Sequence, residues 1–310
     1  MRQVRAKQPG LPIVVLSGQA DGEIALEALR EGAQDYISKN EFNSSSLERS
    51  IRFAIERHER QSLEKKLLQH RQDSDAARMV QQRLMPSEFP SLPGFELAGR
   101  CRPTDAVGGD FFDFAPWPGN QLGVVVGDVS GHGMPAALLM ASTHRVIRTL
   151  REYVPDPADL LVAANVQICE DTHLERFVAV FLAVIDLETR QARYVGAGHG
   201  GVLMKKNGEV IKLPGTALPA GMTEDLAMEP TGGFQMEAGD LLAVYTDGLY
   251  ECQKPDKEIL GQPAILSLLR ENREAPLNDL LDQLITNSRD FCAPDKPGDD
   301  ITIALVRCTE

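Results

Sequence analysis

The longest regular pattern along the chain lies between Asn40 and Met85, a stretch without Gly or Pro. Apolar residues recur there at the three- and four-residue spacing of one helix face, with charged and amide side chains between them. The spacing predicts one long helix over residues 47–85, capped by one of the serines at 44–46 and ended by Pro86. The apolar positions are Leu47, Ile51, Ala54, Ile55, Leu63, Leu67, Leu68, Ala76, Met79, Val80 and Leu84.

The apolar face of this predicted helix has two interpretations. As a single helix it would be a solvent-exposed spacer, whereas two copies would bury the face in a coiled coil. The seam is imperfect, because His58 and Gln61 interrupt it and residues 73–75 are polar. We expect a homodimer through residues 47–85, with the spacer as the alternative.

The first segment alternates strand and helix. The all-apolar run Ile13–Leu16 is typical of a strand buried in a parallel sheet. An amphipathic helix is expected over residues 21–31, and a second strand over residues 35–39. This order, followed by the long helix, predicts part of a doubly wound α/β domain.

The third segment is large enough for a complete domain. Asn207-Gly208 separates two apolar runs, which indicates a hairpin. Strands joined by tight turns and helices set apart from them predict an α+β domain with antiparallel sheets. Strands are expected at residues 122–126, 177–185, 192–195, 202–204, 210–213, 241–245 and 301–306, and helices at 135–153, 157–172, 263–271 and 277–291.

Composition limits the functional class. The chain has 43% hydrophobic and 25% charged residues, as ordinary globular proteins do, and no run approaches a membrane span. The N-terminus lacks the apolar core of a signal peptide. A net charge of −13 argues against a nucleic-acid partner. Five scattered cysteines without a CxxC pair indicate free thiols, so we expect a cytoplasmic protein.

Four Asp-containing turns carry the candidate chemistry. They contain Asp110, Asp128, Asp247 and the pair Asp299–Asp300, and three of them adjoin apolar strands. Each alone is compatible with an ordinary turn, but carboxylates that converge repel one another unless cations lie between them. The set therefore predicts a site for Mg²⁺ or Mn²⁺. His132 lies close to Asp128 and is a candidate proton donor or an ordinary structural histidine. His199 is interpreted as structural.

Residues 1–58 contain the motifs LPIVVLSG and REGAQDYISK. With these motifs the segment resembles the second half of a response-regulator receiver domain. The resemblance assigns Ser17 to the family's switch position and Lys39 to its phosphate-contacting position. The first three strands of such a domain are absent, so no residue here takes the phosphoacceptor role, and we expect Met1 to be an internal start.

Residues 86–310 contain, in order, the motifs VGGDFFDF, GDVSGHGMPAALLMA, GAGHG, YTDGLYE and DDITIALV. This ordered series resembles that of the metal-dependent PPM protein phosphatases, most closely the bacterial SpoIIE/RsbU type. This resemblance implies an α-β-β-α sandwich of two antiparallel sheets with two cations at one end. The expected domains are 1–58, a helical linker at 59–85, and the phosphatase at 86–310, a layout that resembles the RssB-type regulators of pseudomonads.

The resemblance also implies roles for the aspartates. Asp128 would bridge both cations, Asp110 and the Val129 carbonyl would serve one, and Asp247 and Asp299 the other. Asp300 would support the site. A water activated by two Mn²⁺ or Mg²⁺ ions would then hydrolyse phosphoserine or phosphothreonine, without a covalent intermediate.

Two other functions could explain parts of this sequence. VGGDFF differs from the GGDEF motif of diguanylate cyclases, because Phe111 stands at the Glu position, and this interpretation is rejected. The alternative that remains is a non-catalytic adaptor that binds a sigma factor and presents it to a protease. The retained aspartates favour the enzyme, with a phosphorylated anti-anti-sigma-type protein as its substrate.

Overall fold

The structure is a computed structural model that describes residues 2–8, 10–18, 22–172, 175–228, 232–295 and 297–309. The chain divides into two compact units, residues 1–73 and 74–310. Helix α3 (Ser44–Leu84) contributes to both units.

The predicted long helix is confirmed as α3, which has 41 residues. Its cap differs from the expected serines. The Ser46 N–H donates to Asn43 Oδ1 at 2.8 Å, and the Asn43 N–H donates to Ser46 Oγ at 2.9 Å. Asn43 is therefore the N-cap and Ser46 its reciprocal partner, because an Asn side chain satisfies the free N–H groups of a first turn.

Unit 1 contains a small parallel sheet. Strands β1 (Val14–Ser17) and β2 (Asp35–Ser38) pair in parallel around α2 (Gly22–Arg30), and η1 (Lys39–Glu41) leads toward α3. A short helix, α1 (Arg2–Lys7), was not predicted. The expectation of a fully buried first strand is wrong, because Leu16 is 44% exposed. Among the described residues the sheet has only these two strands.

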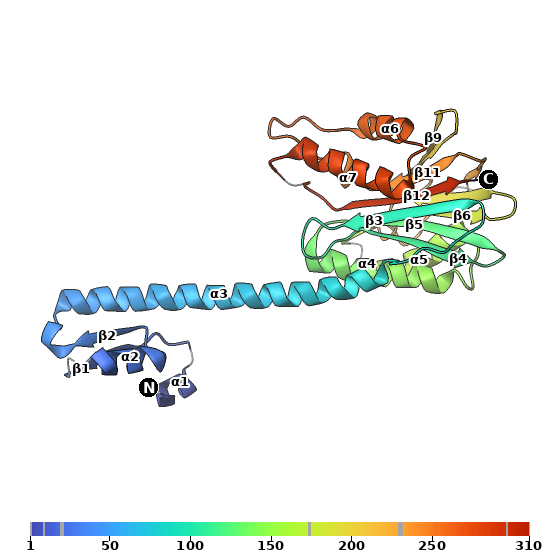
Figure 1. Cartoon of the computed structure of the whole chain (residues 1–310). Helices are drawn as coiled ribbons and strands as arrows, with labels where there is room; N and C mark the ends of the chain where they lie inside the picture. The colour runs from blue at the N-terminus through green and yellow to red at the C-terminus, as the bar shows by residue number, and fades with distance from the viewer. Residues whose placement is uncertain are drawn as a thin grey trace. The chain divides into compact units, whose positions relative to one another are not determined.

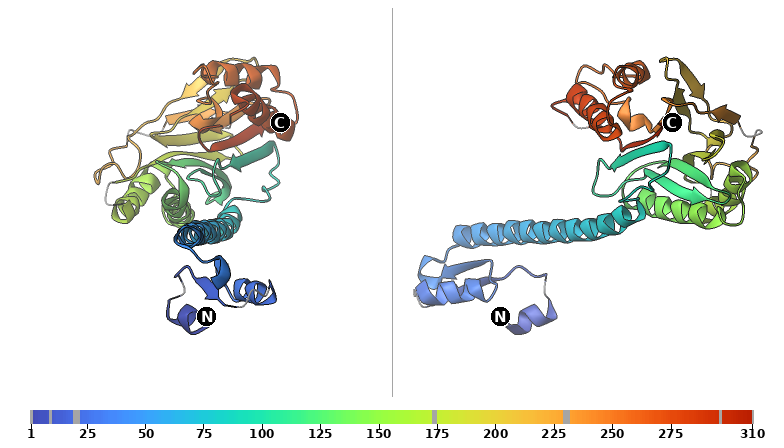
Figure 2. Two further views of the ribbon diagram at one scale, coloured as in Figure 1. Left: turned by 90° about the vertical axis from the view of Figure 1, so that its left-hand side faces the viewer. Right: turned by 45° about the vertical axis from the view of Figure 1, so that its right-hand side comes forward.

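Unit 2 is built on two stacked antiparallel sheets. One sheet has the order β10-β7-β6-β5-β4 and the other β3-β12-β11-β8-β9. Helices α4 and α5 cover the outer face of the first sheet, and α6 and α7 cover that of the second (Figures 1 and 2). The predicted α+β fold, an α-β-β-α sandwich, is confirmed.

Among the described residues, each sheet of unit 2 contains five strands. The first sheet contains β4 (Phe111–Trp117), β5 (Gln121–Val129), β6 (Val178–Asp186), β7 (Gln191–Ala197) and β10 (Gly232–Gln235). The second contains β3 (Phe95–Arg102), β8 (Gly201–Met204), β9 (Val210–Leu213), β11 (Leu241–Tyr245) and β12 (Ile301–Cys308). The helices are α4 (Gly133–Leu150), α5 (Pro157–Thr172), α6 (Gln262–Glu271) and α7 (Leu277–Cys292), with the short η2 at Asp247–Leu249.

Three apolar clusters hold these layers together. The central one lies between the sheets and includes Phe112, Val124 and Phe181. The second joins α4 and α5 to their sheet around Phe111 and Met140, and the third joins α6 and α7 to the other sheet. Because every layer buries an apolar face against the next, the ends of the strands are left to carry polar side chains.

All seven predicted strands and all four predicted helices of this unit form near their expected bounds, and the Asn207-Gly208 hairpin joins β8 to β9. Strands β3, β4 and β10 were missed. Strand β4 contains Pro116, a residue that is unusual within a sheet. The sheet tolerates this proline because β4 is an edge strand. The five cysteines are free, as expected.

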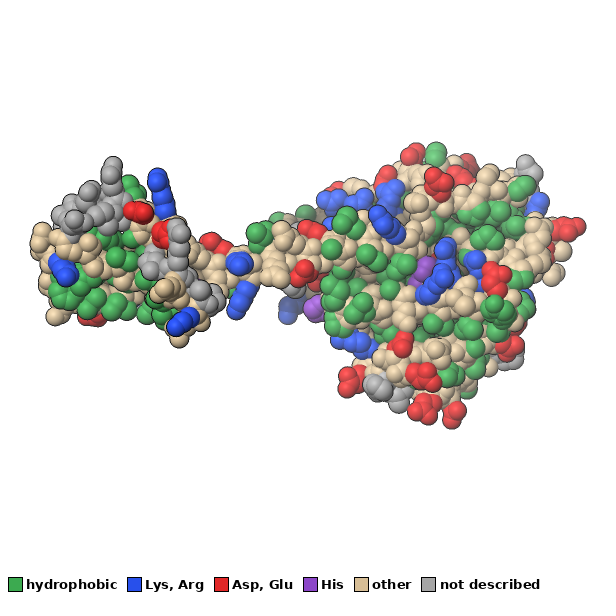
Figure 3. Space-filling model, turned by 90° about the horizontal axis from the view of Figure 1, so that it is seen from below, with side chains coloured by type: hydrophobic (Ala, Val, Ile, Leu, Met, Phe, Trp, Pro, Cys, Tyr) green, Lys and Arg blue, Asp and Glu red, His purple; other side chains and the backbone are tan. Residues whose placement is uncertain are grey.

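The surface of unit 2 mixes apolar and charged side chains (Figure 3). On α4, Leu138 is 65% exposed, and on α5 Val166 is 49% exposed. None of the helices in the described ranges combines the length and the apolar character needed to cross a membrane.

Candidate functional site

The predicted acidic residues lie at strand ends of both sheets. Asp110 directly precedes β4, and Asp128 lies near the end of β5. The pairing of Phe111 with Gly127 makes these two aspartates neighbours. In the other sheet, Asp247 follows β11 and Asp299 precedes β12, and β11 and β12 pair with each other. Two aspartates from each sheet therefore meet at one end of the sandwich.

A hydrogen bond ties the two sheets together at this end. The Thr246 hydroxyl donates to Asp110 Oδ2 at 2.7 Å, and the Thr302 N–H donates to Thr246 Oγ1 at 2.9 Å. The Asp110 side chain is only 3% exposed. The position of this carboxylate is thus fixed by the sheet opposite its own.

Burial and mutual repulsion raise the pKa values of these carboxyls. Burial, with Asp247 and Asp299 nearby, raises the pKa of Asp128 to about 7. Burial and the neighbouring Asp128 raise the pKa of Asp110 well above its usual value, and burial and Asp299 raise that of Asp247. Such a cluster is unfavourable when all its members are ionised and no cation offsets them.

The donor set fits divalent cations. Carboxylate oxygens are the ligands that Mg²⁺ and Mn²⁺ prefer. No three Asp, Glu, His or Cys side chains of the described residues are placed to hold a single ion. A bound ion would therefore take the rest of its shell from water and main-chain oxygens, as Mg²⁺ commonly does. The Val129 carbonyl, expected to be such a ligand, lies beside the loop before Asp110, since a Cβ built on Gly109 would be 2.8 Å from its oxygen.

Asp300 supports the loop before Asp110. Its two oxygens accept hydrogen bonds from the Thr104 N–H at 2.7 Å and the Gly109 N–H at 2.9 Å. There is no room for a side chain at position 108, where a Cβ would lie 2.1 Å from Asp300 Oδ2. The conformation of the 104–109 loop therefore depends on Asp300.

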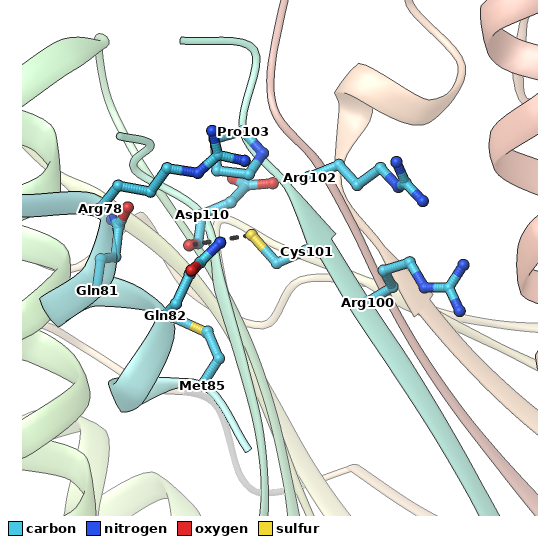
Figure 4. A pocket seen from close by; sticks show the side chains of 9 residues that line it. All are labelled: Arg78, Gln81, Gln82, Met85, Arg100, Cys101, Arg102, Pro103 and Asp110. Carbon is cyan, nitrogen blue, oxygen red and sulfur yellow. Dashed lines mark hydrogen bonds between the residues drawn. The ribbon is translucent and has the colours of Figure 1, made fainter. Parts of the chain in front are cut away.

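The predicted proton donor lies at the edge of this site. His132 precedes α4, its side chain is 90% exposed, and its Nδ1 lies 3.7 Å from Asp105 Oδ2. The Arg102 side chain, the arginine near Asp110 in the chain, points away from Asp110 (Figure 4). Neither side chain has a recorded contact with the aspartates within the described part of the chain.

The C-terminal end of α3 contacts the same loop. Gln81 is buried; its Nε2 donates to the Gly108 carbonyl at 2.5 Å, and the Gly108 N–H donates to its Oε1 at 3.2 Å. Gln81 and Asp110 line a cavity of about 340 Å³ together with Cys101, whose thiol donates to the Asp110 carbonyl (Figure 4). Nothing in the sequence distinguishes Gln81 from the other amide residues along the helix, although the helix ends shortly before the Asp110 loop in the chain.

The residues expected for a receiver site lie in unit 1. Ser17 ends β1 opposite Ser38 of β2, and Lys39 follows directly. A Cβ built on Gly18 would lie 3.7 Å from Lys39 Cδ. Ser17 and Lys39 therefore lie at the same end of the small parallel sheet.

Comparison with known proteins gives a family to unit 2. Residues 118–309 match the family model described as Stage II sporulation protein E (SpoIIE). Phosphoserine phosphatase RsbU of Bacillus subtilis is 23% identical over 238 residues, which cover 75% of this chain and 69% of RsbU.

Solved structures share the fold. The SiaA-PP2C domain of Pseudomonas aeruginosa aligns with a TM-score of 0.69 at 22% identity, covering 79% of this chain and 99% of that domain. RsbX, solved in complex with magnesium, aligns with a TM-score of 0.54 at 18% identity, covering 72% of this chain and 99% of RsbX. With a family match over most of unit 2 and this fold, the chain belongs to the SpoIIE family of PPM-type serine/threonine phosphatases.

Proposed function

We propose that unit 2 hydrolyses phosphoserine or phosphothreonine in a protein substrate, using two divalent cations, Mn²⁺ or Mg²⁺, held at the aspartate cluster. The observation that carries this proposal is the convergence of Asp110, Asp128, Asp247 and Asp299 from both sheets, with raised pKa values in the first three. An adaptor would have no use for a buried acidic cluster, which is costly without cations.

Each residue of the cluster has its own proposed role in metal binding. Asp128 has Asp110 near it on one side and Asp247 and Asp299 on the other, so it would help to hold both ions. Asp110 and the Val129 carbonyl would hold one ion, and Asp247 and Asp299 would hold the other. Bound divalent cations supply a water that ionises near neutral pH and positive charge that offsets the phosphoryl oxygens.

The surrounding residues keep this arrangement in place. Thr246 orients Asp110 through its hydroxyl, and Asp300 holds the loop that leads to Asp110. His132, which is exposed beside the site, is proposed to donate a proton to the leaving serine or threonine oxygen once substrate covers it.

The proposed substrate is a phosphorylated anti-anti-sigma-type regulator, which the resemblance to the RsbU type suggests. Unit 1 is proposed to be part of a receiver domain, with Ser17 and Lys39 at its switch and phosphate positions. Along α3, Leu63, Leu67 and Leu68 are 68%, 50% and 58% exposed, which supports a homodimer that buries them.

The direct test is hydrolysis of p-nitrophenyl phosphate and of a phosphoserine protein with increasing Mn²⁺ or Mg²⁺. Turnover should depend on the metal, stop with a chelator, and fall at least a hundredfold in Asp247→Asn. Asp225→Asn, a change of the same kind at an exposed position, is the control. Hydrolysis that survives chelation, or no hydrolysis of either substrate at any metal concentration, would rule out the proposed chemistry.

A further inference from the structure

A short loop passes from one sheet to the other beside the acidic cluster. Gly198, His199 and Gly200 connect the end of β7 to the start of β8. Gly198 bridges to Val180, next to the pair formed by Ala179 and Asp128. On the other side, β8 pairs with β11, which leads into Asp247. The loop therefore lies between the strand ends that carry Asp128 and Asp247.

His199 provides the only side chain of this loop beyond hydrogen. Gly198 has φ +71°, and a Cβ there would lie 2.4 Å from Pro219 Cγ. A Cβ on Gly200 would lie 2.8 Å from the Leu213 carbonyl oxygen. Because both neighbours must be glycine, the loop presents a single imidazole to its surroundings.

The hydrogen bonding of His199 defines its tautomer. Its Nδ1 lies 2.8 Å from the Gly200 carbonyl oxygen, which only accepts, so Nδ1 carries the proton. Burial lowers the pKa of His199 to about 4, so the ring is neutral near pH 7. Nε2 is then an acceptor, and it has no recorded partner among the residues that the structure describes.

His199 lines a groove that is continuous with the aspartate cluster. The groove has a volume of about 390 Å³ and is lined by Asp128 and Asp247 at the cluster. Phe177, Pro214, Pro219 and Tyr250 give it apolar walls. Apart from the two aspartates, Lys212 on β9 is the one charged side chain that lines it within the described ranges. The positive charge of Lys212 therefore lies in a groove whose other charged side chains are acidic.

We propose that this groove binds the extended polypeptide next to the phosphorylated residue, and that it selects substrates with acidic flanking residues. His199 Nε2 accepts a hydrogen bond from a substrate backbone N–H, and Lys212 pairs with a carboxylate of the substrate. This inference rests on the proposed phosphatase function and adds the class of sequence that the site recognises. The apolar walls suit an extended chain, and the continuity with Asp128 and Asp247 places that chain beside its phosphoryl group.

The charge preference is tested with two short phosphoserine peptides, one flanked by glutamate and the other by lysine. The wild-type protein should have the higher kcat/KM for the glutamate peptide, and the difference should lie in KM. High salt should reduce this difference, because it screens the charges. Reversing the charge in Lys212→Glu should change the ratio of the two kcat/KM values about tenfold toward the lysine peptide. Lys206→Glu, on the same hairpin but outside the groove, is the control and should leave the ratio as it is.

The role of His199 is tested with two amide replacements. Asn keeps a donor for the Gly200 carbonyl but has no group at the Nε2 position, whereas Gln can place an acceptor there. The affinity for a glutamate peptide carrying a non-hydrolysable phosphoserine analogue should fall about three- to tenfold in His199→Asn and recover in part in His199→Gln. Binding is measured by calorimetry with Mn²⁺ present.

Several outcomes would overturn the proposal. An unchanged peptide ratio in Lys212→Glu would remove the acidic preference, and affinity retained in His199→Asn but lost in His199→Gln would make the imidazole purely structural. Weaker Mn²⁺ binding by His199→Asn without peptide would make it a metal ligand instead. Hydrolysis of p-nitrophenyl phosphate by the wild type separates these failures from that of the phosphatase function, since its absence would overturn both.

Discussion

The hydroxyl of Thr246 donates a 2.7 Å hydrogen bond to the carboxylate of Asp110, and this bond joins residues on opposite sheets of the sandwich. Asp110 precedes β4, whereas Thr246 follows β11. The bond lowers the pKa of this carboxyl, against burial and Asp128, which together raise it well above its usual value. The packing of the two sheets therefore favours the ionised carboxylate.

We expect Asp128→Asn to abolish metal-dependent hydrolysis and to make the metal-free protein more stable. The variant removes one charge from a repulsive cluster, so its melting temperature without metal should exceed that of the wild type. Saturating Mn²⁺ should stabilise the wild type by about 2.7 kcal/mol at a hundredfold excess over Kd, and the variant much less.

Thermal melts with and without Mn²⁺ measure both effects, and Asp225→Asn serves as the control. A variant that keeps wild-type turnover, or that gains as much stability from Mn²⁺ as the wild type, would contradict the bridging role of Asp128.

The four aspartate turns were predictable because each adjoins an apolar run or a glycine pair, which are local signals. Their meeting at one end was predictable only through the resemblance to the PPM family. Asp110 and Thr246 are 136 positions apart, and no local pattern reports which strands pair or which sheets stack. The same limit applies to Gln81, since its hydrogen bonds with Gly108 depend on where the 108–110 loop lies.

Single residues also misled the sequence interpretation. Strand β4 was not predicted and contains Pro116, which the sheet tolerates because β4 is an edge strand. Leu16 was expected to be buried from its apolar neighbours, but burial depends on which other strands and helices cover the sheet. Periodicity gives the kind of element, and long-range packing decides its environment.

Acid should destabilise the protein partly through His199. Its pKa of about 4 lies below the value near 6.5 expected in the unfolded chain, so the folded state resists protonation. The neutral ring contributes its full stabilisation above pH 6.5, and this contribution is lost as the pH falls toward 4. At pH 5 the loss in the free energy of unfolding is about 2 kcal/mol. Urea unfolding of the wild type and His199→Gln at pH 7.5 and pH 5 checks this.

The wild type should lose more stability than His199→Gln between the two pH values, because the variant has no imidazole to protonate. Equal losses would mean that His199 is protonated as easily in the folded state as in the unfolded one.

The apolar face of α3 should make the chain dimeric. Replacing Leu63 and Leu67 with Asp would bury charge in the seam and should give a monomer at micromolar concentration. Sedimentation equilibrium measures the change, and Gln69→Asp on the same helix is the control for added charge. A monomeric wild-type protein under these conditions would reduce α3 to a spacer.

The contact between Gln81 and Gly108 should couple the end of α3 to the affinity of the site for cations. In Gln81→Leu, a side chain of similar size replaces the amide, and both polar groups of Gly108 lose their partner. Leaving them unsatisfied costs about 1–3 kcal/mol, so the 108–110 loop should shift and carry Asp110 away from its place. We expect weaker Mn²⁺ binding, by roughly tenfold, with kcat recovering at high Mn²⁺ because no reacting group is lost.

The metal dependence of both p-nitrophenyl phosphate turnover and melting temperature measures this change in Mn²⁺ affinity. Gln82→Leu is the matched control, since Gln82 lines the same cavity without a recorded bond to the loop within the described residues. Metal curves for Gln81→Leu that superimpose on those of Gln82→Leu would leave α3 without influence on the site.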